Sequence, residues 1–154
     1  MKGNPKILEH LNDRLAEELT AISMYMVHSE MCAHWGFTKL HEAIEKQAID
    51  EMKHAESLIG RILFFEGSPT VSKLHQMKIG RTVEEIVTAD QDAEIDAVKA
   101  YNESIAAAGD AGDNSTADLL TRILLDEERH VAWGETQREL IKQMGLQNYL
   151  ATQA

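Results

Sequence analysis

Two six-residue segments of the chain each carry a glutamate and a histidine three positions apart. They read IDEMKH (49–54) and LDEERH (125–130), so Glu51 is followed by His54 and Glu127 by His130. On a helix, residues three apart lie on one face, and a carboxylate beside an imidazole is a ligand pair for a transition metal. The repeated pair therefore raises a metal site as the first hypothesis.

A single Glu-x-x-His is weak evidence, because short motifs occur by chance. For either copy alone, the plain alternative is a helix surface with solvated ion pairs. The two copies, however, are separated by 76 residues, and the same offset relates Glu18 to Glu94 and Tyr25 to Tyr101. We therefore expect one αα-hairpin in two copies, packed with approximate two-fold symmetry.

All six polar residues interrupt apolar stripes at helical spacing. Glu18 falls between Leu15 and Ile22, and Glu94 falls between Val87 and Tyr101. Four buried carboxylates without counter-charge would cost several kcal/mol apiece, a penalty that two divalent cations remove. Carboxylates with one imidazole per metal suit iron or manganese better than zinc or copper.

The elements that must position these residues are helices. Predicted helices run from Pro5 to about Trp35, from about Lys39 to Phe65, from Thr82 to about Ala108, and from Ser115 to Gly145, with LQNYLAT as a short fifth helix. Asn4, Thr82 and Ser115 are the expected N-caps. A long connection over 67–81 lets the second and third helices run parallel. The pattern predicts an all-α four-helix bundle forming a single domain over 1–154.

Composition narrows the function classes. Lys+Arg number 15 against 26 Asp+Glu, a net charge of −11, which argues against nucleic acid or an anionic membrane surface as a partner. The lone Cys32 excludes an internal disulfide, a zinc knuckle and an iron–sulfur cluster held by this chain. The start MKGNPKILEH has no apolar run of a signal peptide. We expect a cytoplasmic protein.

One glutamate from each of two helices with Glu-x-x-His from the other two is the pattern of ferritin-like di-iron proteins. Within that superfamily the chain resembles bacterioferritin along nearly its whole length, through MKG at the start, IDEMKHAE from Ile49, RILFFEG from Arg61 and GLQNYLATQA at the end. The resemblance implies a ferritin-like fold, a hollow cage of 24 subunits, and iron storage and detoxification. It also implies a ferroxidase that oxidises Fe(II) to Fe(III) with O2 or H2O2.

The resemblance further implies a role for each site residue. Glu18 and Glu94 would be terminal ligands of a di-iron centre, Glu51 and Glu127 would bridge the two irons, and His54 and His130 would each bind one. Met52 would ligate a haem b shared between two subunits, and a ferredoxin-type reductant would drive iron release. Two departures concern the family pattern: Lys46 stands where some members have the histidine of an inner-surface iron site, and Glu45 where an aromatic residue is often found near the haem.

Four further residues are candidates for supporting roles. Asp50 and Asp126 each lie four residues before a predicted ligand histidine and could accept a hydrogen bond that orients an imidazole, although solvated aspartates are an equally good interpretation. Tyr25 and Trp133 could donate hydrogen bonds or electrons, or could simply be core aromatics.

Two other functions compete with iron storage. The first is a di-iron or di-manganese redox enzyme, peroxidase-like or catalase-like, without storage; the lone cysteine excludes the form with an appended Cys-rich iron domain. The second is a structural bundle without metal, for which six inward polar residues have no purpose. The size of the assembled particle separates these hypotheses, because only storage requires a large shell.

Overall fold

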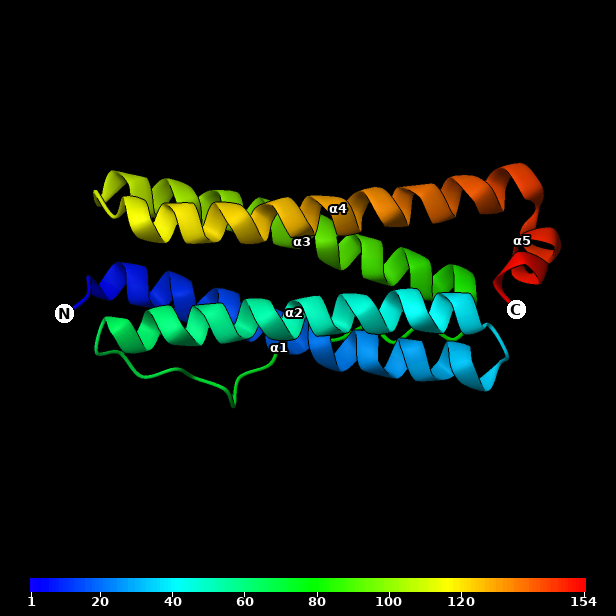
Figure 1. The fold of residues 1–154 in the computed structure, drawn as a ribbon, viewed down its shortest axis with the longest axis horizontal. Helices are drawn as coiled ribbons and strands as arrows, with labels where there is room; N and C mark the ends of the chain where they lie inside the picture. The colour runs from blue at the N-terminus through cyan, green and yellow to red at the C-terminus, as the bar shows by residue number, and fades with distance from the viewer.

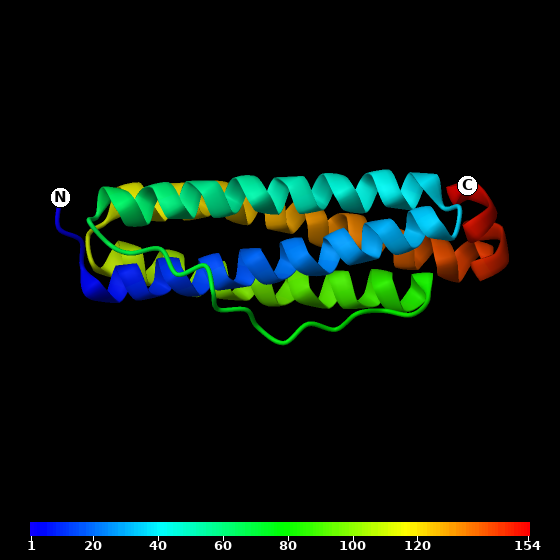
Figure 2. The same ribbon diagram turned by 90° about the horizontal axis from the view of Figure 1, so that it is seen from below.

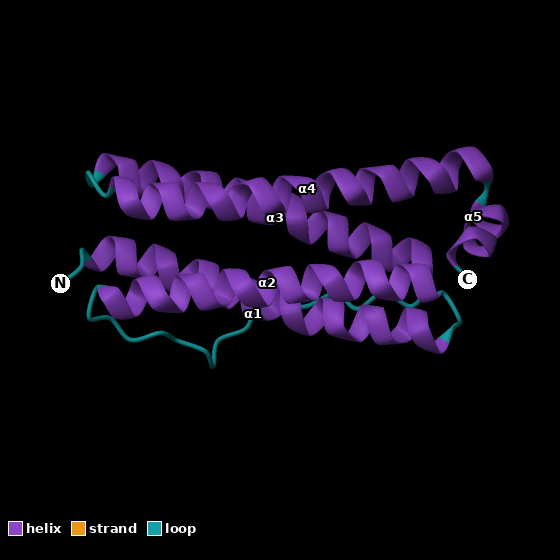
Figure 3. Cartoon of the chain, viewed as in Figure 1, coloured by secondary structure: helices purple, strands orange, loops and turns teal.

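The computed structural model describes residues 1–154 and contains five α-helices and no strand (Figures 1 and 3). The four long helices would each be roughly 40–46 Å at 1.5 Å per residue. This confirms the predicted all-α bundle with a short fifth helix. The helices are α1 (Pro5–His34), α2 (Thr38–Phe64), α3 (Val83–Asp110), α4 (Asn114–Met144) and α5 (Leu146–Gln153).

The bundle consists of two antiparallel hairpins, α1 with α2 and α3 with α4 (Figure 1). The crossover that joins them, residues 65–82, runs along the length of the bundle (Figure 2). Because it returns the chain to the end where α2 began, α2 and α3 run in the same direction, as the long connection predicted.

The hairpin turns repeat as well as the helices. Gly36 and Gly112 are 76 residues apart and have φ of 87° and 71°, a region that only glycine enters without cost. The residues that follow them, Phe37 and Asp113, share nearly the same backbone conformation, with φ of −91° and −93° and ψ of 71° in both. The backbone therefore supports the duplication inferred from the offset.

Capping agrees with the sequence at two helices and differs at one. Asn4 accepts from the N–H of Lys6 at 2.9 Å, and Thr82 accepts from the N–H of Glu85 at 3.2 Å. At α4 the prediction of Ser115 was wrong: the N-cap is Asp113, whose carboxylate accepts from the N–H of Thr116 at 3.1 Å. The helix begins two residues earlier because the repeated turn ends at Asp113.

The apolar core has two parts. One cluster, with Leu11, Leu15 and Leu58 among its fully buried members, fills the end of the bundle near the N-terminus. The other, with Ile44 and Ile86, fills the opposite end beneath α5. Buried polar side chains occupy the layer between them, so the predicted site lies at mid-bundle. No helix is both long and apolar enough to pass through a bilayer.

The crossover is held to the bundle by backbone hydrogen bonds to side chains. The N–H of Thr70 donates to Asn12 at 2.8 Å and that of His75 donates to Thr20 at 2.9 Å. Near its end, the N–H of Gly80 donates to Nε2 of the buried His28 at 3.0 Å. These contacts hold the crossover against the outside of the mid-bundle layer.

Candidate metal centre

The six residues that the sequence selected lie together at the centre of the bundle. Each of the four long helices contributes at least one, because the Glu-x-x-His pairs share a face of α2 and of α4 while single glutamates project from α1 and α3. None is more than 7% exposed: Glu18 3%, Glu51 1%, His54 5%, Glu94 2%, Glu127 1% and His130 7%.

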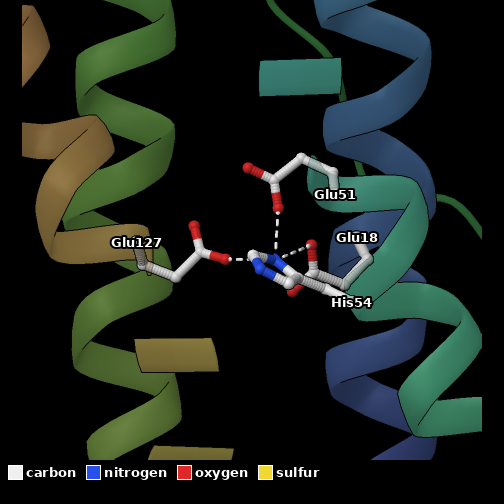
Figure 4. A group of neighbouring side chains, drawn as sticks. All are labelled: Glu18, Glu51, His54 and Glu127. Atoms are coloured by element: carbon white, nitrogen blue, oxygen red, sulfur yellow. Dashed lines mark hydrogen bonds and ion pairs between the residues drawn. The ribbon is translucent and has the colours of Figure 1, made fainter. Parts of the chain in front are cut away.

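Their donor atoms form two overlapping sets, each with all its atoms within 4.8 Å of one another. We call Glu18, Glu51, His54 and Glu127 the first ligand group, shown in Figure 4. We call Glu51, Glu94, Glu127 and His130 the second ligand group. Since Glu51 and Glu127 belong to both, two metal ions bound there would share these carboxylates. The two imidazole centroids are 6.4 Å apart.

The imidazole of His54 presents Nδ1 to the first ligand group. Nδ1 lies 2.9 Å from Glu51 Oε2, 2.9 Å from Glu127 Oε1 and 3.7 Å from Glu18 Oε2 (Figure 4). Its other nitrogen, Nε2, lies 3.1 Å from Asp126 Oδ2. With Nε2–H donating to Asp126, the Nδ1 lone pair is free to bind a metal.

His130 repeats this arrangement in the second ligand group. Its Nδ1 lies 2.9 Å from Glu51 Oε1 and 3.3 Å from Glu94 Oε1, and its Nε2 lies 3.2 Å from Asp50 Oδ2. Asp50 and Asp126 therefore each contact a ligand histidine that they could orient, but the histidine lies on the opposite helix. Each one reaches the histidine of the other helix rather than the one four residues further along its own.

Two tyrosines hydrogen-bond the glutamates of α1 and α3, also crosswise. The hydroxyl of Tyr25 donates to Glu94, and that of Tyr101 donates to Glu18. The sequence analysis named Tyr25 as a candidate hydrogen-bond donor but named Tyr101 only as its counterpart in the repeat. The offset of 76 residues from Tyr25 was the signal that Tyr101 would also donate a hydrogen bond at the site. Trp133 packs against the cluster beneath α5.

Burial and proximity strongly perturb the protonation of the layer. Burial raises the pKa of Glu18 and of Glu94 well above the ordinary value, and the neighbouring carboxylates add to this. Burial alone would lower the pKa of His54 and His130, but hydrogen bonds to the surrounding carboxylates outweigh it and raise both. Without metal, the layer therefore holds protons in place of cations.

Three buried atoms of the two ligand groups, Glu51 Oε1, Glu127 Oε1 and His130 Nδ1, have no well-oriented hydrogen bond. Both carboxylate oxygens nevertheless lie 2.9 Å from an imidazole nitrogen. Buried polar atoms in folded proteins are normally satisfied, so three such atoms within the two ligand groups suggest a missing partner. A divalent cation meets that need better than water, because carboxylate oxygen and imidazole nitrogen are ligands for Fe²⁺ and Mn²⁺. The residues present fit a pair of such ions.

A cavity of about 300 Å³ reaches this layer from the side of α1 and α3. Its outer part is lined by Thr20 of α1, Asp92 of α3, and His75 and Lys78 of the crossover. Its inner part is lined by the carboxylates shared by the two ligand groups and by both single glutamates. The crossover therefore lines part of the cavity that adjoins the layer.

A third group of potential ligands, Glu30, His41 and Glu45, lies on the surface. The side chains of Glu30 and Glu45 are 71% and 54% exposed, and they lie 4.0 and 3.9 Å from His41 nitrogens. Such loosely paired, solvated groups are ordinary on a helix surface.

Met52 differs from its neighbour Glu51 in its surroundings. It is 45% exposed, because one residue further along a helix turns the side chain about 100° away from the bundle centre. The apolar side chain of Ile49, three residues earlier, is 44% exposed. A thioether beside an exposed apolar side chain is of the kind that could hold haem iron. The charged Glu45 and Lys53 nearby are also exposed.

The bundle and its layer of carboxylates and imidazoles define the ferritin-like class, and the ferritin-like domain family matches residues 8–144. The bacterioferritin of Brucella melitensis is 40% identical over 149 residues, covering 97% of this chain and 92% of that protein. The bacterioferritin of Mycolicibacterium paratuberculosis is 39% identical over 151 residues (98% and 95%), and that of Streptomyces coelicolor is 38% identical over 152 residues (99% and 91%). The chain belongs to the bacterioferritin family.

Proposed function

We propose that the protein stores iron, and that each subunit oxidises Fe(II) to Fe(III) at the mid-bundle layer before the product enters a mineral. The observation that carries the proposal is the convergence of four buried carboxylates and two oriented imidazoles on two overlapping ligand groups. Membership in the bacterioferritin family supports it.

In this proposal Fe(II) is the substrate, and the side chains bind and orient it. Glu18 with His54 and Glu94 with His130 each hold one ion, and Glu51 and Glu127 bridge the pair. Two Fe(II) ions supply two electrons, which with two protons reduce O2 to H2O2, or reduce H2O2 to water. Bound ions replace the protons of the metal-free layer, so binding releases protons to solvent.

The first test removes the bridges. Glu51→Ala and Glu127→Ala should each abolish the fast rise in Fe(III) absorbance after aerobic addition of Fe(II), while circular dichroism remains helical. Glu128→Ala is the matched control, because Glu128 is exposed one residue further along α4. A fast phase that persists in both bridge variants would contradict the proposal.

The same proposal includes a cage of 24 chains with a haem b between two subunits, and a ferredoxin-type reductant for iron release. Met52 of each of the two subunits would hold the haem through its sulfur, because it is the half-exposed thioether on the outer face of α2. When bound, such a haem supplies one-electron transfer between an outside reductant and the stored iron. A di-metal redox enzyme without storage would need no cage.

The haem site has a separate test. Met52→Leu keeps the volume and apolar character of the side chain but removes the sulfur. The variant should assemble and oxidise Fe(II) normally, yet lose the optical spectrum of axially ligated haem after reconstitution and release iron slowly to a reduced ferredoxin. Unchanged axial ligation in the variant would exclude Met52 as the ligand.

A further inference from the structure

The two halves of the repeat carry different side chains at equivalent positions around the ligand layer. The offset of 76 pairs Arg14 with Asp90, and His28 with Ser104. In the structure Arg14 contacts Ser104, with Nη1 to Oγ at 3.1 Å, and Asp90 contacts His28, with Oδ1 to Nδ1 at 2.6 Å. Equivalent places beside the two ligand groups therefore hold a cation on one side and an anion on the other.

Arg14 lies on the side of the first ligand group, one helical turn before Glu18. Its guanidinium is 5.9 Å from the ring centroid of Tyr101, whose hydroxyl donates to Glu18. The partner of Arg14 is Glu17, at 2.8 Å. Arg14 and Glu17 thus form a salt bridge with no net charge.

Asp90 lies on the side of the second ligand group, one turn before Glu94, and is 3% exposed. Its partner His28 is neutral: Nε2 accepts a hydrogen bond from the N–H of Gly80 and so carries no proton, while Nδ1–H donates to Asp90. The second oxygen of Asp90 has no hydrogen-bond partner. Burial raises the pKa of Asp90, and the hydrogen bond from His28 opposes this effect. When ionised, the carboxylate is a buried negative charge that no cation balances.

We propose that Asp90 and Arg14 make the two metal positions inequivalent, so that the second ligand group binds a divalent cation before the first. The inference rests on the proposed function and assigns these two residues as positioning residues that act through the local field. The preference depends on the difference between the effects of one unit of charge at the nearer and at the farther metal position, which at an effective dielectric constant of about 20 is on the order of tenfold in affinity for a divalent cation.

The test uses the assembled protein after chelation of its metal, with Co²⁺ as the probe. Crystals are soaked with Co²⁺ at one ion per subunit, and anomalous scattering is compared at the two positions. Visible absorption during a Co²⁺ titration gives the two affinities in solution. We expect the second ligand group to be about tenfold more occupied than the first at this loading.

Two variants change the field from opposite sides. Asp90→Asn keeps an acceptor oxygen for His28 but removes the negative charge. The preference of Co²⁺ for the second ligand group over the first should then fall below about threefold. Arg14→Gln removes the cation and should strengthen binding at the first ligand group, while Asp90 remains. Because Arg14→Gln leaves the buried pair with His28 intact, it tests the inference even if Asp90→Asn does not fold. Glu103→Gln, an exposed charge change on α3, should leave the preference unaltered.

The outcomes separate the inference from the function it rests on. The inference is supported if Co²⁺ fills the second ligand group first and if the ratio of occupancy between the two groups is smaller in both charge variants. Equal filling, or filling of the first group first, overturns it while leaving iron binding in place. Absence of Co²⁺ from both positions overturns the proposed function and this inference with it.

Discussion

At the scale of the residue, each candidate ligand histidine is oriented from the opposite hairpin. His54 of α2 contacts Asp126 of α4, and His130 of α4 contacts Asp50 of α2. The hydrogen bond at Nε2 decides which nitrogen carries the proton, so it also decides which nitrogen faces the ligand groups. The metal affinity of one hairpin should therefore depend on the other.

Replacing Asp126 tests this dependence. Asp126→Ala leaves the Nε2–H of His54 without its acceptor, so we expect Co²⁺ to bind the first ligand group about 10–100-fold more weakly. Asp126→Asn retains an acceptor oxygen and should recover much of that loss. Spectroscopic titration with Co²⁺ measures both, with Asp118→Ala as the control, since Asp118 is 62% exposed on the same helix. Equal affinities of wild type and Asp126→Ala would show that His54 needs no such partner.

At the scale of the element, the start of α4 joins the two hairpins. Asp113 caps α4 and accepts from the hydroxyl of Thr116 at 2.6 Å, and Arg61 of α2 donates to Asp113 at 3.1 Å and to Thr116 at 2.8 Å. Partial burial tends to raise the pKa of Asp113, but the hydrogen bonds from Thr116 and the charge of Arg61 outweigh it and lower the pKa below its ordinary value of 3.8.

Asp113→Ala should destabilise the fold by about 1–2 kcal/mol, the usual cost of losing an N-cap. For a chain of this size that corresponds to a fall in Tm of about 2–8 °C, measured by calorimetry. Ser115→Ala is the matched control and should have little effect, because Ser115 is exposed and does not cap α4. A larger fall in Tm for Ser115→Ala than for Asp113→Ala would show that Ser115 caps the helix.

The same variant has a defined pH dependence. Because the folded-state pKa of Asp113 is lowered, its stabilisation is present above the unfolded value and is lost as the pH falls through the folded value. The difference in Tm between wild type and Asp113→Ala should therefore be full near pH 7 and shrink below about pH 4. A difference that grows in acid would exclude the ionised cap.

At the scale of the whole molecule, α5 closes one end of the bundle. Tyr149 is fully buried in the cluster beneath α5, and its hydroxyl donates to Gln137 of α4 at 2.9 Å. The helix has only 8 residues, too few for a core of its own, so its remaining surface is available to neighbouring subunits of the proposed cage.

Deleting residues 145–154 should alter the proposed cage. We expect light scattering to show smaller particles than the intact protein gives, with helical circular dichroism retained and a lower Tm because Tyr149 is lost from the core. Tyr149→Phe keeps the packing and should preserve particle size. An intact protein that is monomeric at micromolar concentration would contradict cage assembly itself.

Local patterns in the sequence predict both the class of fold and the residues of the buried layer. Helical periodicity is a local property, so the apolar stripes placed Glu18, Glu51 and Glu127 on inward faces before any packing was known. The offset of 76 then tied the two hairpins together, since a repeat in sequence becomes a repeat in space when both copies adopt one structure. The N-cap of α4 was predicted wrongly because Asp113 and Ser115 are both residue types that favour this position. The conformation of the preceding turn makes Asp113 the cap.

The contacts between side chains across the bundle depend on how the helices pack. The contacts of Asp126 with His54, Tyr101 with Glu18, and Asp90 with His28 span 72, 83 and 62 residues of sequence. No periodicity within a helix encodes them, because they depend on the rotation and axial shift of one helix against another, which the packing of the whole core sets. For the same reason the opposite charges of Arg14 and Asp90 acquire meaning only when folding brings them beside equivalent ligand groups.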